Sequence, residues 1–192
     1  GKVIDYTGLP PAYETLRLLF ADMNGNGTRD LVWVTTDFQI KYIELCTAPL
    51  AGLLNRIDNG MGAVTTLSYR SSTDFMVDAK RQGQPWHTPM AAPMPVVAEI
   101  LTTDSFDKLG LAATTTRLEY SYADGYYDGR EREFRGFGEV RTTEHGDERH
   151  PTRVTEALLH VGVNLATGED EEALKGKVYR SVVQDETGLI YG

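Results

Sequence analysis

Residues 125–140 read GYYDGREREFRGFGEV, and residues 53–73 read LLNRIDNGMGAVTTLSYRSST. Both stretches combine glycine with aromatic or β-branched residues, a composition typical of β-strands that are interrupted by bulges and tight turns. Asp58-Asn59-Gly60 and Asp124-Gly125 contain residues that tolerate positive φ, so we expect each to close a hairpin or near-hairpin. The two stretches therefore predict antiparallel β-sheets.

Strand signals dominate the rest of the chain. Arg117 to Tyr122 alternates apolar and polar residues, as expected of a strand with one buried and one solvated face. Residues 82–95 contain four of the eight prolines, so we place a long surface connection there. Asp170–Lys175 is long enough for one or two helical turns, whereas Thr152–Val161 fits either a helix or a strand. The predicted strands are Leu16–Phe20, Leu31–Thr35, Ile40–Leu45, Ala63–Tyr69, Val96–Leu101, Thr114–Tyr122, Val140–Thr143 and Val178–Val183.

Composition and charge narrow the class of protein. The chain has 192 residues and 41% hydrophobic content, which is enough for a real core. No run approaches the ~18 apolar residues that are needed to span a bilayer. The net charge of −9 argues against a nucleic-acid partner, because the chain would repel phosphates. Cys46 is the single cysteine, which excludes an internal disulfide, and its β-type surroundings favour a buried, apolar thiol.

An oxygen-rich loop runs from Asp22 to Asp30. Side-chain oxygens recur at every second position, and Gly27 stands where the chain must turn sharply, which is the arrangement that a hard cation such as Ca²⁺ requires. Trp33 occupies the place of the bidentate glutamate of an EF-hand, and strand-like flanks give the loop a propeller-like context. A plain Asn-Gly turn without metal is the alternative. The candidate ligands of a structural Ca²⁺ ion are Asp22, Asn24, Asn26, Thr28 and Asp30.

No catalytic constellation can be assembled from the sequence. Glu131-Arg132-Glu133 has the Glu-x-Glu form of ADP-ribosyltransferases, with Ser71-Ser72-Thr73 as an imperfect serine strand, but short motifs of this kind match by chance. Alternating cross-strand ion pairs on a solvated face explain Glu131, Arg132, Glu133 and Arg135 more simply. The four histidines do not converge, and no thiol completes a zinc set. We therefore expect no intrinsic enzymatic activity.

Five features in chain order point to a family. They are the Asp22–Gly27 loop, Asn59-Gly60-Met61-Gly62, the proline stretch Trp86–Pro95, the motif Glu131–Gly138, and Ala173-Leu174-Lys175-Gly176-Lys177. Together they resemble the middle region of the B component of bacterial insecticidal toxin complexes, the TcB/SpvB-type (TcdB middle region) family, which is related to Rhs/YD-repeat shell proteins. Gly125–Arg130 looks like a degenerate Tyr-Asp repeat unit. Because 192 residues is a small part of such a subunit, we expect a segment of a longer protein.

The resemblance implies a mainly β fold with two parts. Residues 1–50 would be the remnant of an FG-GAP/VCBS-like propeller blade, and residues 51–192 part of an Rhs-type β-shell. The segment would be structural and non-enzymatic, in a secreted subunit that encloses a cytotoxic effector polypeptide together with a C component. That subunit would dock on the membrane-translocating A component without inserting into the membrane itself.

Two other functions remain open at this stage. A Ca²⁺-dependent cell-surface or adhesin-like binding module would be favoured by several Asp22–Asp30-type loops at regular spacing in a longer sequence. An ADP-ribosyltransferase would reveal itself in an NAD-glycohydrolase assay.

Overall fold

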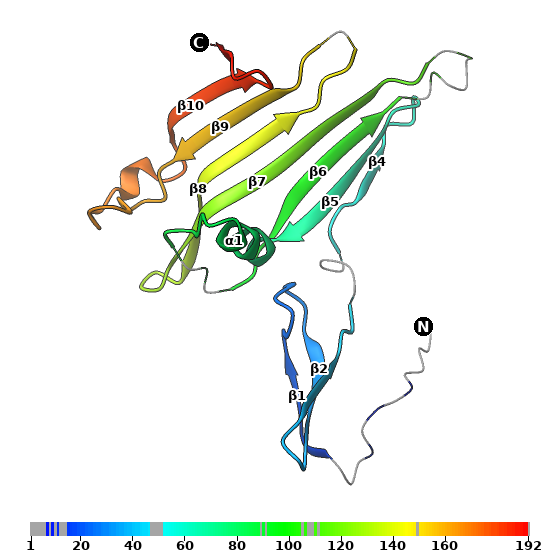
Figure 1. The fold of residues 1–192 in the computed structure, drawn as a ribbon, viewed down its shortest axis with the longest axis vertical. Helices are drawn as coiled ribbons and strands as arrows, with labels where there is room; N and C mark the ends of the chain where they lie inside the picture. Colours follow the sequence, from blue (N-terminus) through cyan, green and yellow to red (C-terminus); the bar gives the residue numbers. More distant parts are fainter. Residues whose placement is uncertain are drawn as a thin grey trace.

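The computed structural model describes residues 7, 9, 11, 15–46, 52–88, 90, 92–104, 106, 110, 112–148 and 150–191. These residues form two antiparallel sheets and a single α-helix that is longer than two turns (Figure 1). Strands account for 49% of the chain and helices for 8%, and neither sheet closes into a barrel. The expected mainly β fold with antiparallel sheets is therefore confirmed.

The small sheet contains the first three strands in the order β1-β2-β3. They are β1 (Thr15–Ala21), β2 (Asp30–Thr35) and β3 (Ile40–Ile43), each paired antiparallel to the next. The central strand is the most buried of the three, with Val32 only 2% exposed, and it pairs with a strand along each edge. The outer strands expose apolar side chains on their surfaces, namely Leu16, Leu18, Phe20, Ile40 and Tyr42.

The large sheet is an eight-stranded meander in the order β11-β10-β9-β8-β7-β6-β5-β4. Every strand pairs antiparallel with its neighbours in sequence, so hairpin connections build almost the whole sheet. The strands are β4 (Arg56–Asp58), β5 (Val64–Ser71), β6 (Pro95–Thr103), β7 (Thr115–Asp128), β8 (Glu133–Glu144), β9 (Arg153–Leu159), β10 (Val178–Asp185) and β11 (Ile190–Tyr191).

The helix α1 (Ser72–Arg81) was not predicted from the sequence. The Ser71-Ser72-Thr73 run, which the transferase alternative would need as a strand, instead joins the last residue of β5 to the first turn of α1. Ser71 is the N-cap: its hydroxyl accepts from Thr73 N at 3.3 Å, and the Asp74 carboxylate accepts from Ser71 N at 3.2 Å. Phe75 packs edge-on against Tyr122 of β7, with ring centroids 5.7 Å apart. The helix thereby covers one face of the large sheet near β5 and β7 (Figure 1).

One of the two predicted hairpin turns is correct. Asn59 N donates to Ala63 O at 3.1 Å and closes the β4–β5 hairpin. The turn expected at Asp124-Gly125 is wrong, because β7 continues to Asp128 and the hairpin closes over residues 129–132. Asp124 does adopt a positive φ of 52°, next to an irregular register in β7. A residue that tolerates positive φ serves a bulge as well as a turn, so the sequence signal was ambiguous.

The remaining predictions concern short elements. Asp170–Lys175 contains the 3₁₀-helix η3 (Glu172–Leu174), which confirms a single turn. The ambiguous stretch Thr152–Val161 contains the strand β9. The proline-rich connection is confirmed, since α1 ends at Arg81 and β6 begins at Pro95. The short strands β4 and β11 were not predicted, because so few residues carry no recognisable period.

Candidate functional site

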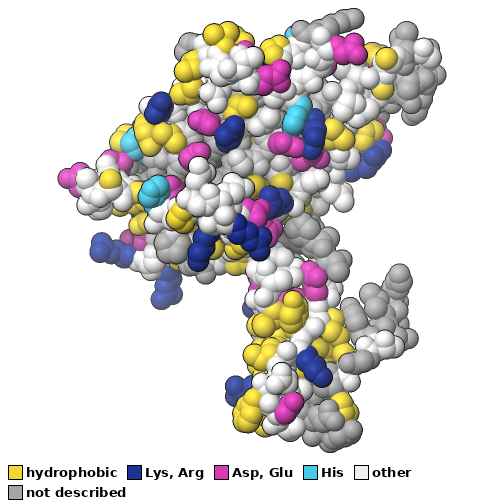
Figure 2. Space-filling model, in the orientation of Figure 1, with side chains coloured by type: hydrophobic (Ala, Val, Ile, Leu, Met, Phe, Trp, Pro, Cys, Tyr) yellow, Lys and Arg dark blue, Asp and Glu magenta, His cyan; other side chains and the backbone are white. Residues whose placement is uncertain are grey.

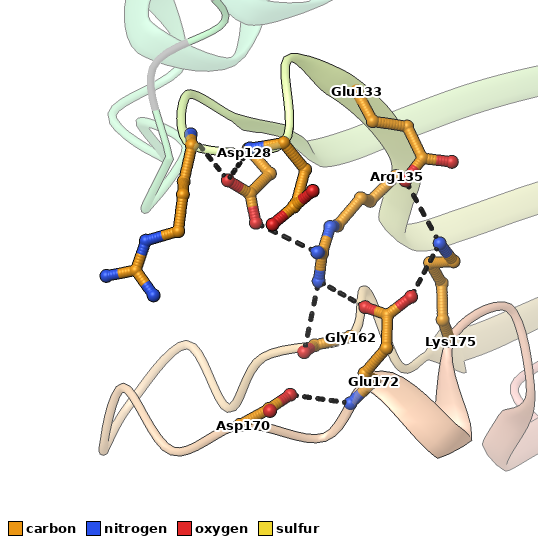
Figure 3. A network of polar contacts seen from close by, with 9 residues as sticks. Asp128, Glu133, Arg135, Gly162, Asp170, Glu172 and Lys175 are labelled. Carbon is orange, nitrogen blue, oxygen red and sulfur yellow. Dashed lines mark hydrogen bonds and ion pairs between the residues drawn. The ribbon is translucent and has the colours of Figure 1, made fainter.

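A buried arginine lies at the centre of a polar network beside the β7–β8 hairpin. The Arg135 side chain is only 8% exposed, and its guanidinium lies 2.9 Å from an oxygen of Asp128 and 2.5 Å from an oxygen of Glu172 (Figure 3). It also donates to the carbonyl oxygen of Gly162 at 3.3 Å. A guanidinium is stable away from water only when carboxylates and carbonyls surround it in this way.

Lys175 extends the network. Its ammonium lies 2.8 Å from Glu172 and 3.1 Å from Glu133 (Figure 3). The hydrogen bond with Glu172, followed by that with Glu133, raises the pKa of the Lys175 ammonium. We name the five residues Asp128, Glu133, Arg135, Glu172 and Lys175 the arginine clasp. The arginine clasp joins the β7–β8 hairpin to the connection between β9 and β10. These two segments are far apart in the sequence.

A glycine at position 162 permits the close approach of the backbone to Arg135. Gly162 has a φ of 82°, and a Cβ at this position would lie 2.7 Å from an Arg135 guanidinium nitrogen. The Gly162 carbonyl reaches the guanidinium only because the backbone comes this close.

The sequence-based expectation of solvated cross-strand ion pairs at residues 131–135 is wrong for Arg135. Arg135 is buried rather than solvated, and Glu131 and Arg132 lie in the hairpin turn. Backbone N–H groups of Glu131 and Arg130 are the main cause of the lowered pKa of the Asp128 carboxyl. The sequence pattern identified the charged residues but could not show that a distant loop would cover one of them.

Aromatic side chains from β7, β8 and the proline-rich connection pack together near the clasp. Phe137 lies 5.3 Å from Phe134, 4.8 Å from Tyr122 and 6.1 Å from Trp86, measured between ring centroids. Gly125 leaves room for this cluster, since a Cβ there would lie 2.5 Å from the sulfur of Met90. The glycine-aromatic motif of residues 125–138 is thus used for packing.

The Asp22–Asp30 loop is closed by its own side chains. One carboxylate oxygen of Asp22 accepts from Gly25 N at 2.7 Å and Asn26 N at 3.2 Å, and the other accepts from Gly27 N at 2.9 Å. Asp30 is 0% exposed, and its Oδ2 accepts from Met23 N at 2.9 Å. Within the part of the chain that the structure describes, its Oδ1 is buried with no hydrogen-bond partner.

The structure adds an acidic residue to this loop. The Glu44 carboxylate accepts from the side-chain amides of Asn24 at 3.1 Å and Asn26 at 2.8 Å. The sequence offered no signal for Glu44, because it follows β3 and reaches the loop only through the fold. The resulting set of carboxylate, amide and hydroxyl oxygens has the hard character that Ca²⁺ prefers. Among the described residues no three His, Cys, Asp or Glu side chains are grouped to hold a metal, so amide and hydroxyl oxygens would be needed.

Each histidine lies beside a carboxylate. His87 contacts Asp124 at 2.9 Å, and this hydrogen bond raises the pKa of the imidazole. The other pairs are His145 with Glu119, His150 with Asp147, and His160 with Glu171. The histidines do not converge on one place, in agreement with the sequence analysis.

Comparison with known proteins decides the family. The family described as "Insecticide toxin TcdB middle/N-terminal region" matches residues 5–166. The chain belongs to this family. A comparison with curated proteins gave no match.

Solved structures show where the TcdB middle-region fold occurs. A chain of the Photorhabdus luminescens Tc holotoxin pore superposes with a TM-score of 0.71 at 24% identity, over 88% of this chain and 10% of that one. A TcdB2-TccC3-TEV structure gives 0.68 at 26% identity over the same shares. TcdB2-TccC3 without its hypervariable C-terminal region gives 0.67 at 26%, again over 88% and 10%. The chain spans about a tenth of the length of these relatives.

In this TcdB middle-region chain two of the sequence motifs lie at hairpin turns. Asn59–Gly62 lies in the β4–β5 turn, and Glu131–Gly138 forms the β7–β8 turn and the start of β8. Lys175 belongs to the arginine clasp. None of the helices in the described residues is long and apolar enough to cross a membrane.

Proposed function

We propose that this segment is a non-enzymatic wall element of a toxin-complex B component. The observation that carries the proposal is the long antiparallel meander, open at both edges, whose fold recurs within TcdB2 in complex with TccC3. The open edges of such a sheet can pair with further strands, as in the wall of a larger β structure. The large sheet would be part of an Rhs-type shell, and the small sheet one propeller blade.

The partners follow from this proposal. The complete subunit would enclose a cytotoxic effector polypeptide together with a C component, and it would dock through its propeller on a membrane-translocating A component. Such a subunit would be secreted. The two apolar outer strands of the small sheet support the blade assignment, because a propeller blade packs against neighbours on both faces.

A chimera tests the wall role. The matching segment of TcdB2 is replaced by this chain, and the chimera is mixed with TccC3. We expect a complex that co-elutes by size exclusion and protects an enclosed polypeptide from protease. A chimera that also carries Arg135→Ala is the matched control for a weakened segment. If the chimera folds but encloses nothing while unmodified TcdB2 does, the wall role is wrong.

The absence of catalysis is part of the same proposal. Glu133 is held by Lys175, and the serine run does not form the continuous strand that a transferase site would require, because β5 ends at Ser71 and α1 begins at Ser72. We expect no NAD hydrolysis by the chain. Activity that disappears in Glu133→Ala would overturn this.

A second proposal concerns the Asp22–Asp30 loop, which would hold a structural Ca²⁺ ion. The unpaired, buried Oδ1 of Asp30 supports it, because an anionic oxygen without a partner is costly. Ca²⁺ should raise the unfolding midpoint by mass action on the folded state, and Asp22→Ala should abolish the rise. Differential scanning fluorimetry with Ca²⁺ and with chelator measures the unfolding midpoint. Identical midpoints in the two conditions would mean that the Asp22–Asp30 loop is a turn that binds no Ca²⁺.

A further inference from the structure

The Asp22–Asp30 loop also touches the large sheet. Figure 1 shows the small sheet beyond the end of the large sheet that carries α1. At this place the hydroxyl of Thr73, in the first turn of α1, donates to the carbonyl oxygen of Gly25 at 2.5 Å. Gly25 permits the approach, since a Cβ on it would lie 3.3 Å from the Thr73 hydroxyl. The loop also lies beside Pro93, which would be in ordinary contact, at 3.9 Å, with a Cβ on Gly27.

The contact is one link in a chain of hydrogen bonds. Asn26 N, in the same peptide group as the Gly25 carbonyl, donates to Asp22 at 3.2 Å. On the other side the Ser71 hydroxyl lies 2.6 Å from the Thr73 hydroxyl. The hydroxyl of Thr73 has a single hydrogen, and it donates this hydrogen to the Gly25 carbonyl oxygen. In the pair with Thr73, the Ser71 hydroxyl is therefore the donor. Linked hydrogen bonds of this kind polarise and strengthen one another.

The helix end of this chain is rigidly held. Ser71 and Ser72 are 2% and 0% exposed. Ser72 N donates to Met94 O at 2.8 Å, and Met94 N donates to the Ser72 hydroxyl at 2.9 Å. The start of α1 is therefore joined to β5, which ends at Ser71, and to the beginning of β6. Thr73 presents its hydroxyl from a position that cannot easily move.

We propose that the Asp22–Asp30 loop is the joint that holds the small sheet in one orientation against the large sheet, with Thr73 as the positioning residue. All pairs of elements in extensive contact lie within one sheet or join α1 to β5 and β7, so the two sheets depend on local contacts such as this one. The Asp22 carboxylate supports the joint from within the loop. The inference concerns this chain's own fold and does not rest on the toxin role.

Residual dipolar couplings of backbone amides test the joint in the full chain. We expect the couplings of both sheets to fit a single alignment tensor. Thr73→Val keeps the shape of the side chain and removes the donor, so the sheets should then need separate tensors, with a loss of alignment magnitude for the small sheet. Thr73→Ser keeps the hydroxyl and should keep one tensor. Thr65→Val is the matched control, because Thr65 bonds to Thr102 within the large sheet at 3.0 Å.

Asp22→Asn weakens the hydrogen bonds inside the Asp22–Asp30 loop and does not alter α1. It should also separate the tensors, and amide chemical shifts report whether each sheet is still folded. Either of two results overturns the proposal: a wild-type chain that already needs two tensors, or folded Thr73→Val and Asp22→Asn chains that both keep one tensor of unchanged magnitude.

Discussion

Arg135 and Gly162 show how single residues decide the structure of this segment. The guanidinium of Arg135 is buried under the β9–β10 connection, where it meets two carboxylates and the Gly162 carbonyl. Burial makes the arginine dependent on all of these partners, since an unpaired charge there would be strongly unfavourable. Gly162 has no charge and no side chain, yet its lack of a Cβ lets its carbonyl oxygen reach the Arg135 guanidinium.

We expect Arg135→Ala to lower the free energy of unfolding by roughly 2–3 kcal/mol. The expected loss is smaller than for a fully buried pair because Glu172 is 48% exposed and solvent screens its charge. Arg130→Ala is the matched control, because Arg130 is exposed and its side chain has no ion pair among the described residues. Urea denaturation measures the free energy of unfolding of both variants. Equal free energies for Arg135→Ala and Arg130→Ala would contradict a stabilising role of the arginine clasp.

Gly162→Ala should be destabilised more than Gly188→Ala. Both glycines have a φ of 82°, so both alanines carry the same backbone strain of about 1–3 kcal/mol. Only Gly162 has the Arg135 guanidinium next to it, whereas nothing lies within 4 Å of a Cβ on Gly188. The difference between their urea midpoints therefore isolates the close approach. Equal losses of stability in the two variants would mean that the Arg135 guanidinium moves away from the new Cβ without cost.

At the scale of elements, turns and caps determine where strands begin and end. The β10–β11 turn is organised by Asp185, which is 8% exposed. Its carboxylate accepts from Thr187 N at 2.9 Å, Leu189 N at 3.0 Å and the Tyr191 hydroxyl at 2.8 Å. These hydrogen bonds, led by those of the Thr187 and Tyr191 side chains, lower the pKa of Asp185 to about 2.

The lowered pKa predicts acid sensitivity of this turn. A carboxyl with a depressed pKa stabilises the folded state fully above its unfolded value of about 3.9, and the contribution is lost as the pH falls towards about 2. Tyr191→Phe removes one donor, so the pKa of Asp185 should rise and the loss should begin at higher pH. Carboxyl-carbon NMR titration of both chains measures the shift. An unchanged Asp185 titration would show that the tyrosine bond is not formed.

At the scale of the whole molecule, the large sheet has open edges. β11 pairs only with Val183 and Gln184, so the first half of β10 has no strand on that side among the described residues. Val178 and Tyr179 there are 54% and 58% exposed. Figure 2 shows further apolar side chains scattered over the small sheet. Unpaired edges with apolar side chains favour pairing with other strands.

The isolated chain should therefore self-associate. We expect sedimentation velocity to show a concentration-dependent increase in the weight-average sedimentation coefficient, because β10 edges of two chains can pair. Tyr179→Lys places a charge at the edge and should reduce the association, while Lys177→Arg is the charge-preserving control. A wild-type chain that stays monomeric at all concentrations would mean that these residues form a complete unit.

The amino-acid sequence by itself determined the family and the β class. Glycine, aromatic and β-branched residues in an ordered set of motifs carry local information, because turn and strand preferences act over a few residues. The Asn59-Gly60 turn, the proline-rich connection and most strands were predicted on these grounds. The Asp22–Asp30 loop was also visible as an oxygen-rich pattern, and its Ca²⁺ remains a proposal.

Only the tertiary structure decided which distant residues meet. Glu44 joins the Asp22–Asp30 loop, Glu172 reaches Arg135, and Thr73 bonds to Gly25, each pair far apart in the chain. Local preference also could not distinguish the positive φ of Asp124 inside β7 from a turn. Such contacts arise from strand order and from burial, which depend on the whole chain rather than on neighbouring residues, and so no short pattern encodes them.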